Sequence, residues 1–288
     1  MSHIKVDGLS YTYSNDTAFA KAALNNVSFE INKGEIVGII GHTGSGKSTL
    51  VQHLNGLIKP QPNKVFLNGA DIVGDPKNLK AIRFKVGLVF QYPEYQLFEE
   101  TVYKDIAFGP KNMKLSDEEI KLRVYESAKL VGIDEELLYK SPFDLSGGQK
   151  RRVAIAGVIA MAPEVIIFDE PTAGLDPVGR ETIFKMIYDY RNLTNATVII
   201  ISHSMEDMAL YAERVMVLNK GEIAMFDKTE KVFANVGLLK EIGLNVPQIT
   251  EVFLKLRECG INISSEVFTV KQAVEAIKAY MNGGDAND

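Results

Sequence analysis

The sequence has little cysteine, no long apolar run and no excess of positive charge. Cys259 is the single cysteine in 288 residues, so no internal disulfide is possible, which is consistent with a reducing compartment. We interpret Cys259 as a small hydrophobic residue of the core. No apolar run approaches the roughly 18 residues that span a bilayer, and residues 1–20 lack the basic-then-apolar layout of a signal peptide. These absences favour a cytoplasmic protein.

The net charge of −5 argues against nucleic acid as a partner, because nonspecific binding to nucleic acid depends mainly on cationic contacts to phosphate. The basic cluster Lys150-Arg151-Arg152 is interpreted instead as one turn of a helix. The 46% hydrophobic content suffices for a core, and the length allows one large domain or one domain with an appendage.

A glycine-rich loop follows a short apolar run at residues 36–40. The run predicts a buried strand, and residues 48–57 predict a helix whose N-terminus faces an anion. Gly44 and Gly46 let backbone N–H groups close on phosphates without a Cβ in the way. Lys47 would reach the β- and γ-phosphates, and Ser48 would offer its hydroxyl to Mg²⁺. The predicted nucleoside triphosphate site comprises Gly41, His42, Thr43, Gly44, Ser45, Gly46, Lys47, Ser48 and Thr49.

Two adjacent carboxylates end a second apolar run, which covers residues 165–168. Phosphate-loop enzymes hold Mg²⁺ at such a strand end. Because successive side chains on a strand point to opposite faces, Asp169 and Glu170 are expected to differ in role. We assign Asp169 to the Mg²⁺ shell and Glu170 to polarising the water that attacks the phosphate.

The segment LSGGQ, residues 145–149, lies between these two motifs and opens a helical stretch that runs to about Met161. Alone it would suit a helix-capping turn, because Ser146 is a good N-cap. In this position it resembles the signature of the ATP-binding-cassette ATPases. The resemblance implies a helix N-terminus that meets the γ-phosphate of ATP held by another subunit, so hydrolysis would need a dimer. The implied signature residues are Ser146, Gly147, Gly148 and Gln149.

The same resemblance implies roles for residues at other strand ends. Gln91 would sense Mg²⁺ and the water, His203 would contact the γ-phosphate, and Asp176 would lie in the loop through which two subunits communicate. Tyr13 would stack on adenine, with Tyr11 as the alternative, since alternating aromatics also suit an ordinary edge strand. The implied catalytic set is Glu170, His203, Gln91 and Lys47, the implied metal set is Ser48, Gln91 and Asp169, and the implied cofactors are ATP and Mg²⁺.

We expect an α/β protein: a phosphate-loop NTPase core with an antiparallel β-layer, a helical signature subdomain and a C-terminal helical extension. The ATPase domain would span residues 1–228, with the helical subdomain at about 93–161. Period-two segments within residues 4–31 predict the β-layer. A capping box predicts a helix over 116–131, and Asn219-Lys220-Gly221 predicts a hairpin turn.

Two apolar stripes of helical spacing lie in the expected extension, residues 229–288. The first stripe is Val246, Ile249, Val252, Phe253 and Leu256, and the second is Val270, Val274, Ile277 and Met281. Both stripes would suit core packing on the same chain. They would also suit a dimer contact that holds two ATPases together between turnovers.

The stretch at residues 86–112, VGLVFQYPEYQLFEETVYKDIAFGPKN, resembles the ATPase subunits of energy-coupling-factor transporters, in the form of the second of two paralogous ATPases. Residues 141–144 and 154–157 add to this resemblance. It implies ATP hydrolysis that powers uptake of vitamins or transition-metal ions. The implied partners are a paralogous ATPase, or a second copy in a homodimer, a transmembrane coupling protein and a substrate-binding membrane subunit. The chain would then lie peripherally at the cytoplasmic face of the cell membrane. The alternatives are the ATPase of a conventional importer and a soluble, ATP-dependent dimerisation switch.

Carboxylates gather around Gln91, in a segment whose only nearby cation is Lys104. The resemblance implies a coupling protein that inserts arginine-bearing helices into such a groove, where a bidentate contact adds geometry as well as energy. The expected coupling groove comprises Gln91, Glu94, Glu99, Glu100 and Asp105. The alternative is a solvated acidic loop.

Overall fold

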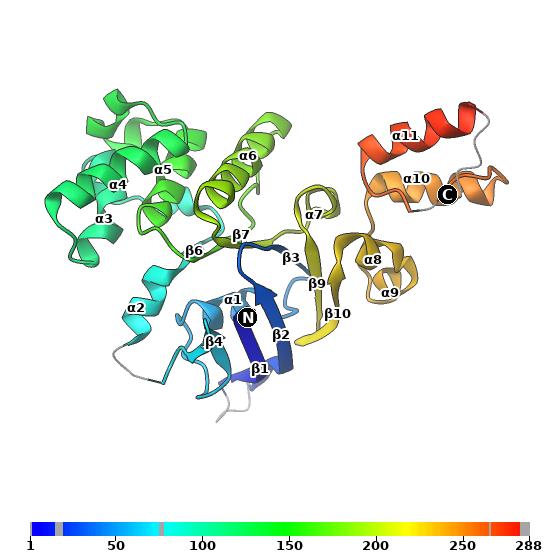
Figure 1. Cartoon of the computed structure of the whole chain (residues 1–288), viewed down its shortest axis with the longest axis horizontal. Helices are drawn as coiled ribbons and strands as arrows, with labels where there is room; N and C mark the ends of the chain where they lie inside the picture. Colours follow the sequence, from blue (N-terminus) through cyan, green and yellow to red (C-terminus); the bar gives the residue numbers. More distant parts are fainter. Residues whose placement is uncertain (1, 15–19, 75–77, 265, 283–288) are drawn as a thin grey trace. The chain divides into compact units, whose positions relative to one another are not determined.

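The computed structural model describes residues 2–14, 20–74, 78–264 and 266–282, and its helices and strands are labelled in Figure 1. The chain forms two compact units. The first unit comprises Met1–Glu35 and Ser48–Ile201, and the second comprises Ile36–Lys47 and Ser202–Asp288. Residues 15–19 of the expected β-layer and 283–288 of the expected extension lie outside the described residues. No helix in the described ranges is long and apolar enough to cross a membrane.

A four-stranded antiparallel sheet forms one part of the first unit, in the order β2-β1-β4-β5. Its strands are β1 (Ser2–Tyr13), β2 (Lys21–Asn32), β4 (Val65–Leu67) and β5 (Ala70–Asp71). Along β2, Val27, Phe29 and Ile31 are buried while Ser28 and Glu30 are exposed. This alternation is that of a strand with one buried face, so the predicted β-layer is confirmed.

Three parallel strands form the centre of the first unit. The strand β7 (Val165–Asp169) pairs with β6 (Val86–Val89) on one side and with β8 (Thr197–Ile201) on the other. Every residue of β8 is buried, as expected for parallel strands that are covered on both faces. The helices of this part are α1 (Lys47–Leu54), α2 (Asn78–Lys85) and α6 (Pro177–Thr194). The helix α1 ends before the predicted residue 57, because Gly56 adopts a left-handed φ of 70°.

A group of helices completes the first unit, drawn in green in Figure 1. Its α-helices are α3 (Val102–Asn112), α4 (Asp117–Leu130) and α5 (Gly147–Ile159), and its short 3₁₀ helices are η1 (Pro93–Gln96), η2 (Glu135–Tyr139) and η3 (Pro142–Asp144). The helix α3 packs against both α4 and α5. Ser116 and Glu119 form the predicted capping box of α4, each side chain accepting a backbone N–H of the other residue.

The second unit contains β3 (Ile36–Ile40), β9 (Arg214–Asn219) and β10 (Glu222–Lys228), where β3 runs parallel to β9 and β9 antiparallel to β10. The predicted hairpin between β9 and β10 is confirmed. Lys220 and Gly221 take positive φ angles of 48° and 83°, which a two-residue hairpin turn requires. The helices of the second unit are α7 (Met205–Tyr211), α8 (Thr229–Ala234), α9 (Val236–Glu241), α10 (Gln248–Glu258) and α11 (Val270–Met281).

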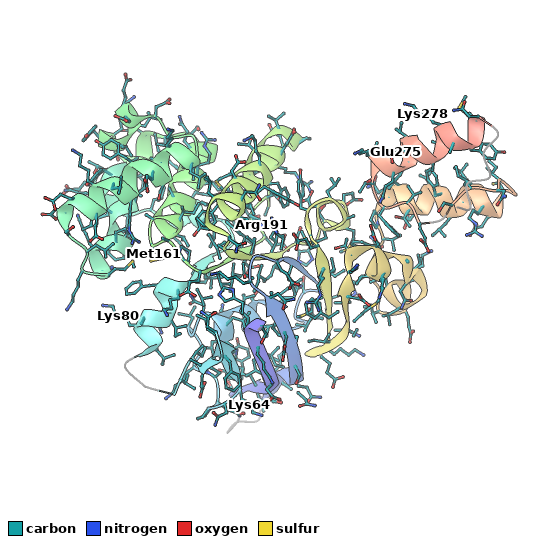
Figure 2. All side chains as sticks on the ribbon, in the orientation of Figure 1. Lys64, Lys80, Met161, Arg191, Glu275 and Lys278 are labelled. Carbon is teal, nitrogen blue, oxygen red and sulfur yellow. The ribbon has the colours of Figure 1, made fainter. Side chains whose placement is uncertain are left out.

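The last two helices share a small core built from Phe253, Ile263, Val267 and Ala273. The first predicted stripe therefore contributes to the core through Phe253, although Val252 is 48% exposed. The second stripe does not: Val270, Val274, Ile277 and Met281 are all exposed. The helix α11 turns Ala273 inward instead, and charged side chains such as Glu275 and Lys278 also project from it (Figure 2).

The interpretation of Cys259 as a core residue is wrong, because this cysteine is exposed. It is the C-cap residue of α10, where the chain leaves the helix. The buried side of α10 is formed earlier in the helix, by Thr250 and Phe253.

Replacing Gly87 of β6 by alanine is expected to lower the free energy of unfolding by about 1–3 kcal/mol, the usual effect of overpacking a core. An added Cβ would lie 2.7 Å from Val158 Cγ1 and 3.1 Å from Pro163 Cγ. Gly237→Ala in α9 is the control: nothing described lies within 4 Å of its Cβ, and alanine is favoured over glycine in a helix by about 1 kcal/mol. Urea titration measures both, and shifts of the same sign would contradict this packing.

Candidate functional site

The phosphate loop connects the end of β3 to the start of α1. Gly41, Gly44 and Gly46 take φ angles of 152°, 80° and 105°, which side chains with a Cβ rarely adopt. Gly41 is also needed for space, since a Cβ there would lie 2.2 Å from the Leu218 carbonyl oxygen. A Cβ at Gly44 would meet no described atom within 4 Å. The backbone at Gly44 is therefore open, and its role in binding phosphate stays a prediction.

The Lys47 side chain is hydrogen-bonded to the backbone of this loop. Its ammonium donates to the Gly41 carbonyl at 2.6 Å and to the His42 carbonyl at 2.9 Å, and only 7% of the residue is exposed. The Ser45 hydroxyl is buried and has no hydrogen-bond partner among the described residues. A positive group and a buried hydroxyl at one loop fit a phosphate-bearing ligand.

His42 joins the phosphate loop to a distant part of the second unit. Its Nε2 lies 2.6 Å from the Ile242 carbonyl oxygen, just beyond the end of α9, so the ring donates to it. The next residue, Gly243, has a φ of 74°, and a Cβ there would lie 3.1 Å from His42 Nε2. No local pattern in the sequence signals this contact, because 200 positions separate the two residues.

The first two predicted metal ligands meet in the first unit. The Ser48 hydroxyl, in the first turn of α1, donates to Asp169 Oδ2 at 3.1 Å, at the end of β7. Their contact joins positions 121 residues apart. No group of three or more His, Cys, Asp or Glu side chains that could hold a metal occurs among the described residues. Gln91, the third predicted ligand, lies two residues beyond β6 with its side chain exposed.

Glu170 follows Asp169 outside the strand. Its φ is 52°, in the left-handed region, while its N–H still donates to the Ile201 carbonyl at the end of β8. Asp169 and Glu170 therefore differ because the backbone turns at Glu170, and not because successive side chains of a strand alternate. The left-handed turn at Glu170, followed by a turn in which the Ala173 N–H donates to the Glu170 carbonyl, redirects the chain after β7.

Asp176 and His203 occupy the starts of helices. Asp176 is exposed and is the N-cap of α6, where its Oδ1 accepts the Gly179 N–H at 2.7 Å. His203 is exposed, two residues after β8, and is followed by Ser204, the N-cap of α7. A role in subunit communication for Asp176 and in γ-phosphate contact for His203 stays a prediction.

The signature segment is a capped helix start. Ser146 Oγ accepts the Gln149 N–H and Gln149 Oε1 accepts the Ser146 N–H, forming a capping box at α5. A Cβ at Gly147 would meet no described atom within 4 Å, and one at Gly148 only Arg152 Nη1 at 3.9 Å. The capping box does not prevent the two glycines from facing a ligand, because the N–H groups of the first helical turn have no partner within the helix.

The two candidate adenine-stacking tyrosines differ in their exposure and contacts. Tyr13 is 40% exposed, and its hydroxyl lies 3.1 Å from Thr49 Oγ1 in α1. Tyr11 is half-buried, with its ring edge-to-face against both Tyr13 and His53, at 4.9 and 4.7 Å between centroids. Tyr13 thus presents an accessible ring beside the helix that carries Ser48, and the ring of Tyr11 packs edge to face against it.

The acidic segment is not one open acidic surface. Asp105 is buried and accepts the backbone N–H groups of Phe98 and Glu99; burial raises its pKa, and the two hydrogen bonds oppose this only in part. Glu100 is exposed and pairs with Lys104. The expectation that Lys104 is the only nearby cation is wrong, because Arg151 of α5 contacts Glu94.

Arg151 binds the Glu94 carboxylate bidentately, with Nε–Oε2 at 2.9 Å and Nη2–Oε1 at 2.7 Å. Burial favours the neutral acid and is the largest influence on Glu94. The hydrogen bonds and charge of Arg151, with a backbone hydrogen bond, outweigh it and hold the pKa of Glu94 below its usual value. The sequence interpretation of Arg151 as part of a helical turn is correct but misses this contact.

Exposed aromatic rings also lie in the same segment. Tyr95, Phe98 and Phe108 are 85%, 59% and 46% exposed, and Phe98 and Phe108 pack edge to face at 5.0 Å. Neighbouring exposed apolar side chains can mark an interaction surface. Sequence analysis singled out the charges here and missed the rings.

Comparisons with known proteins agree on one family. A family model described as ABC transporter matches residues 24–173. The energy-coupling factor transporter ATP-binding protein EcfA2 of Caldanaerobacter subterraneus subsp. tengcongensis is 53% identical over 280 residues, covering 97% of this chain and 98% of the relative. A structure of cbiO1 from Clostridium perfringens, part of the ABC transporter complex cbiONQ, is similar with a TM-score of 0.75 and 38% identity, over 88% of this chain and 99% of that one. A dimeric ATP-binding cassette bound to ADP and Pi in a post-hydrolysis state matches with a TM-score of 0.69 and 31% identity, over 78% and 98%.

Tyr13→Ala is expected to weaken ATP binding about 2- to 10-fold, because an aromatic stack contributes about 0.5–1.5 kcal/mol. Tyr13→Phe keeps the ring and loses only the hydroxyl near Thr49, so its affinity should stay within about twofold, the scale of one net hydrogen bond or less. Calorimetric titration of the purified chain with ATP measures both. Equal losses for the two variants would assign the role to the hydroxyl instead of the ring.

Proposed function

The chain belongs to the ABC transporter family as an ATP-hydrolysing subunit of the energy-coupling factor type, and we propose that its phosphate loop binds ATP, with Ser48 and Asp169 at the metal and a second ATPase completing the site. The observation that carries this proposal is the hydrogen bond from Ser48 to Asp169. It places the start of α1, directly after Lys47, at the strand end that bears Glu170. ATP hydrolysis is coupled to transport in this family, and the resemblance favours vitamins or transition-metal ions as the cargo.

Ser48 and Asp169 would hold Mg²⁺. A hydroxyl and a carboxylate at 3.1 Å offer the oxygen ligands that this ion prefers. Such a small set of protein ligands fits an ion that leaves positions for waters and substrate phosphates. When bound, Mg²⁺ supplies positive charge next to the phosphates. Gln91 completes the proposed metal set from the end of β6.

Glu170 would act on the attacking water. Its backbone enters the left-handed region directly after Asp169, and we assign Asp169 to the metal and Glu170 to accepting a proton from the water. Lys47 would exchange its bonds to the Gly41 and His42 carbonyls for bonds to phosphate oxygens. His203 would add a contact to the γ-phosphate from the end of β8.

A second ATPase would supply the remaining contacts. The open glycines at the start of α5 suit an approaching phosphate, and the similar cassette bound to ADP and Pi is dimeric. We propose that Ser146, Gly147, Gly148 and Gln149 serve the ATP of the partner, with Asp176 between the two sites. The partner would be a paralogous subunit of the same family. The exposed stripe on α11 would add a contact between the two chains.

Glu170→Gln is expected to keep ATP affinity and to lose hydrolysis by roughly 10²- to 10⁴-fold, the share that positioned proton transfer contributes. The measurement is phosphate release from the assembled ATPase pair, with ATP affinity determined on the same preparation. Lys47→Ala serves as the contrasting variant, since it should weaken ATP binding itself. Full turnover by Glu170→Gln with the partner's site disabled would remove Glu170 from this role.

The exposed aromatic surface of Tyr95, Phe98 and Phe108 would dock the membrane coupling protein. Aromatic residues dominate the energy of protein interfaces, especially where their rings leave water. Glu99 and Glu100 flank these rings and would face basic groups of the partner. Glu94 and Asp105 belong to the interior of this surface, so they would shape it rather than pair with the partner. This face would lie against the cytoplasmic side of the membrane complex.

Tyr95→Ser combined with Phe98→Ser is expected to reduce co-purification of the coupling protein by about 10-fold or more, because aromatic hot spots each contribute about 2 kcal/mol or more. ATP affinity of the chain should not change. Leu193→Ser is the matched control, since Leu193 of α6 is 75% exposed and lies outside the aromatic surface. A normal yield of complex from the double variant would place the docking site elsewhere.

A further inference from the structure

Arg151 is buried to an unusual degree for a charged residue, with 4% of its surface exposed. It belongs to α5, one turn after the glycines of the signature. Its guanidinium contacts two other segments of the first unit. Two of its nitrogens bind Glu94, as described above, and Nη1 donates to the Pro171 carbonyl at 3.2 Å and to the Ala173 carbonyl at 2.8 Å.

Each contacted segment borders a residue with a proposed function. Glu94 lies in η1, three positions after Gln91 and one before the exposed Tyr95. Pro171 and Ala173 lie directly after Glu170, in the short link to Asp176. Arg151, on the signature helix, therefore forms hydrogen bonds both to Glu94 of the proposed docking surface and to the backbone that follows Glu170, the proposed base.

Tyr92 strengthens the same junction. Its ring lies 5.8 Å from the Arg151 Cζ, within the range of a cation–π contact. The ring also comes within 3.9 Å of the position that a Cβ would take at Gly174. Two side chains thus connect the segment after Gln91 to the segment after Glu170.

The chemistry of the contact requires arginine. A guanidinium donates in several fixed directions at once, whereas an ammonium is a single point charge. Lysine at this position could reach Glu94 or the two carbonyls, but not both in this geometry. A buried ion pair is also weak evidence for stability, because desolvation of both charges offsets most of the attraction. The pair suits a role in orientation better than a role in holding the fold together.

We infer that Arg151 is a positioning residue that transmits docking at the aromatic surface to Glu170. Movement of η1 would shift Glu94, and Arg151 would carry that shift to the Pro171 and Ala173 carbonyls and to the start of α5. The stimulation part of this inference rests on the proposed docking of the coupling protein. The positioning of Glu170 does not, because it depends only on contacts within this chain.

Three variants test the inference: Arg151→Lys, Glu94→Gln and the two combined. Each is assembled with its ATPase partner and assayed for ATP affinity, melting temperature and kcat, alone and with the membrane subunits. Arg151→Lys should lower kcat roughly 10- to 100-fold, the scale of a displacement of about 1 Å near reacting atoms, while KM for ATP stays within about twofold. Glu94→Gln leaves the carbonyl contacts in place, so it should keep basal kcat within about threefold and lose the stimulation by the membrane subunits.

In stimulation by the membrane subunits, Arg151→Lys and the combined variant should each lose no more than Glu94→Gln alone, since two residues that act through one contact are not additive. The matched control is Arg123→Lys: Arg123 of α4 also donates to two backbone carbonyls, those of Ala160 and Met161, but contacts no segment of the site. It should alter melting temperature without altering kcat.

Two results would overturn the inference. One is additive loss in the combined variant. The other is a parallel fall of melting temperature, ATP affinity and kcat in Arg151→Lys, the pattern of a structural residue. If the wild-type pair gains no turnover from the membrane subunits, the docking proposal fails instead, and the split between kcat and KM of Arg151→Lys alone then decides whether Arg151 positions Glu170.

Discussion

The hydrogen bond between the Ser48 hydroxyl and the Asp169 carboxylate is the contact on which the proposed ATP site depends. It joins the first turn of α1 to the end of β7, and β7 is paired in parallel with β6 and β8. Parallel neighbours end at one edge of a sheet, so the residues that follow them gather there. Gln91 follows β6 and Glu170 follows β7, and these two strands pair in parallel. The order of the strands thus places two residues with proposed roles at neighbouring strand ends, although 79 positions separate them in the sequence.

Local patterns predicted much of this molecule, because each signal lies within a few residues. Glycine spacing and a following lysine predicted the phosphate loop, and Ser116 with Glu119 predicted a helix start that the structure reproduces. Contacts between distant positions could not be predicted in this way. His42 and Ile242 are 200 positions apart and Arg151 and Glu94 are 57 apart, and no periodicity relates them. The position of Cys259 depends on where a helix ends, which patterns locate poorly.

Charge in the sequence is a poor guide to charge at the surface. Glu94, Glu100 and Asp105 look alike in one short segment, yet the first is neutralised by a buried arginine, the second by an exposed lysine and the third serves as a cap for backbone N–H groups. Their environments move the pKa of Glu94 down and that of Asp105 up. Exposed aromatic rings lie in the same segment, at Tyr95, Phe98 and Phe108. The segment that the sequence predicted as an electrostatic groove therefore also exposes apolar surface in the folded chain.

The neighbours of the phosphate loop within the second unit come from late in the chain. β3 pairs with β9 from Val37–Arg214 to Ile40–Val217, the Gly221 N–H donates to the Ser45 carbonyl, and His42 binds Ile242. During translation these partners leave the ribosome long after the loop itself. The loop therefore reaches its described form only after β9 and Ile242 have been synthesised. A nascent or truncated chain that stops before β9 carries the nucleotide motif of the phosphate loop but lacks the strand that pairs with β3, so such a chain is expected to hold ATP poorly.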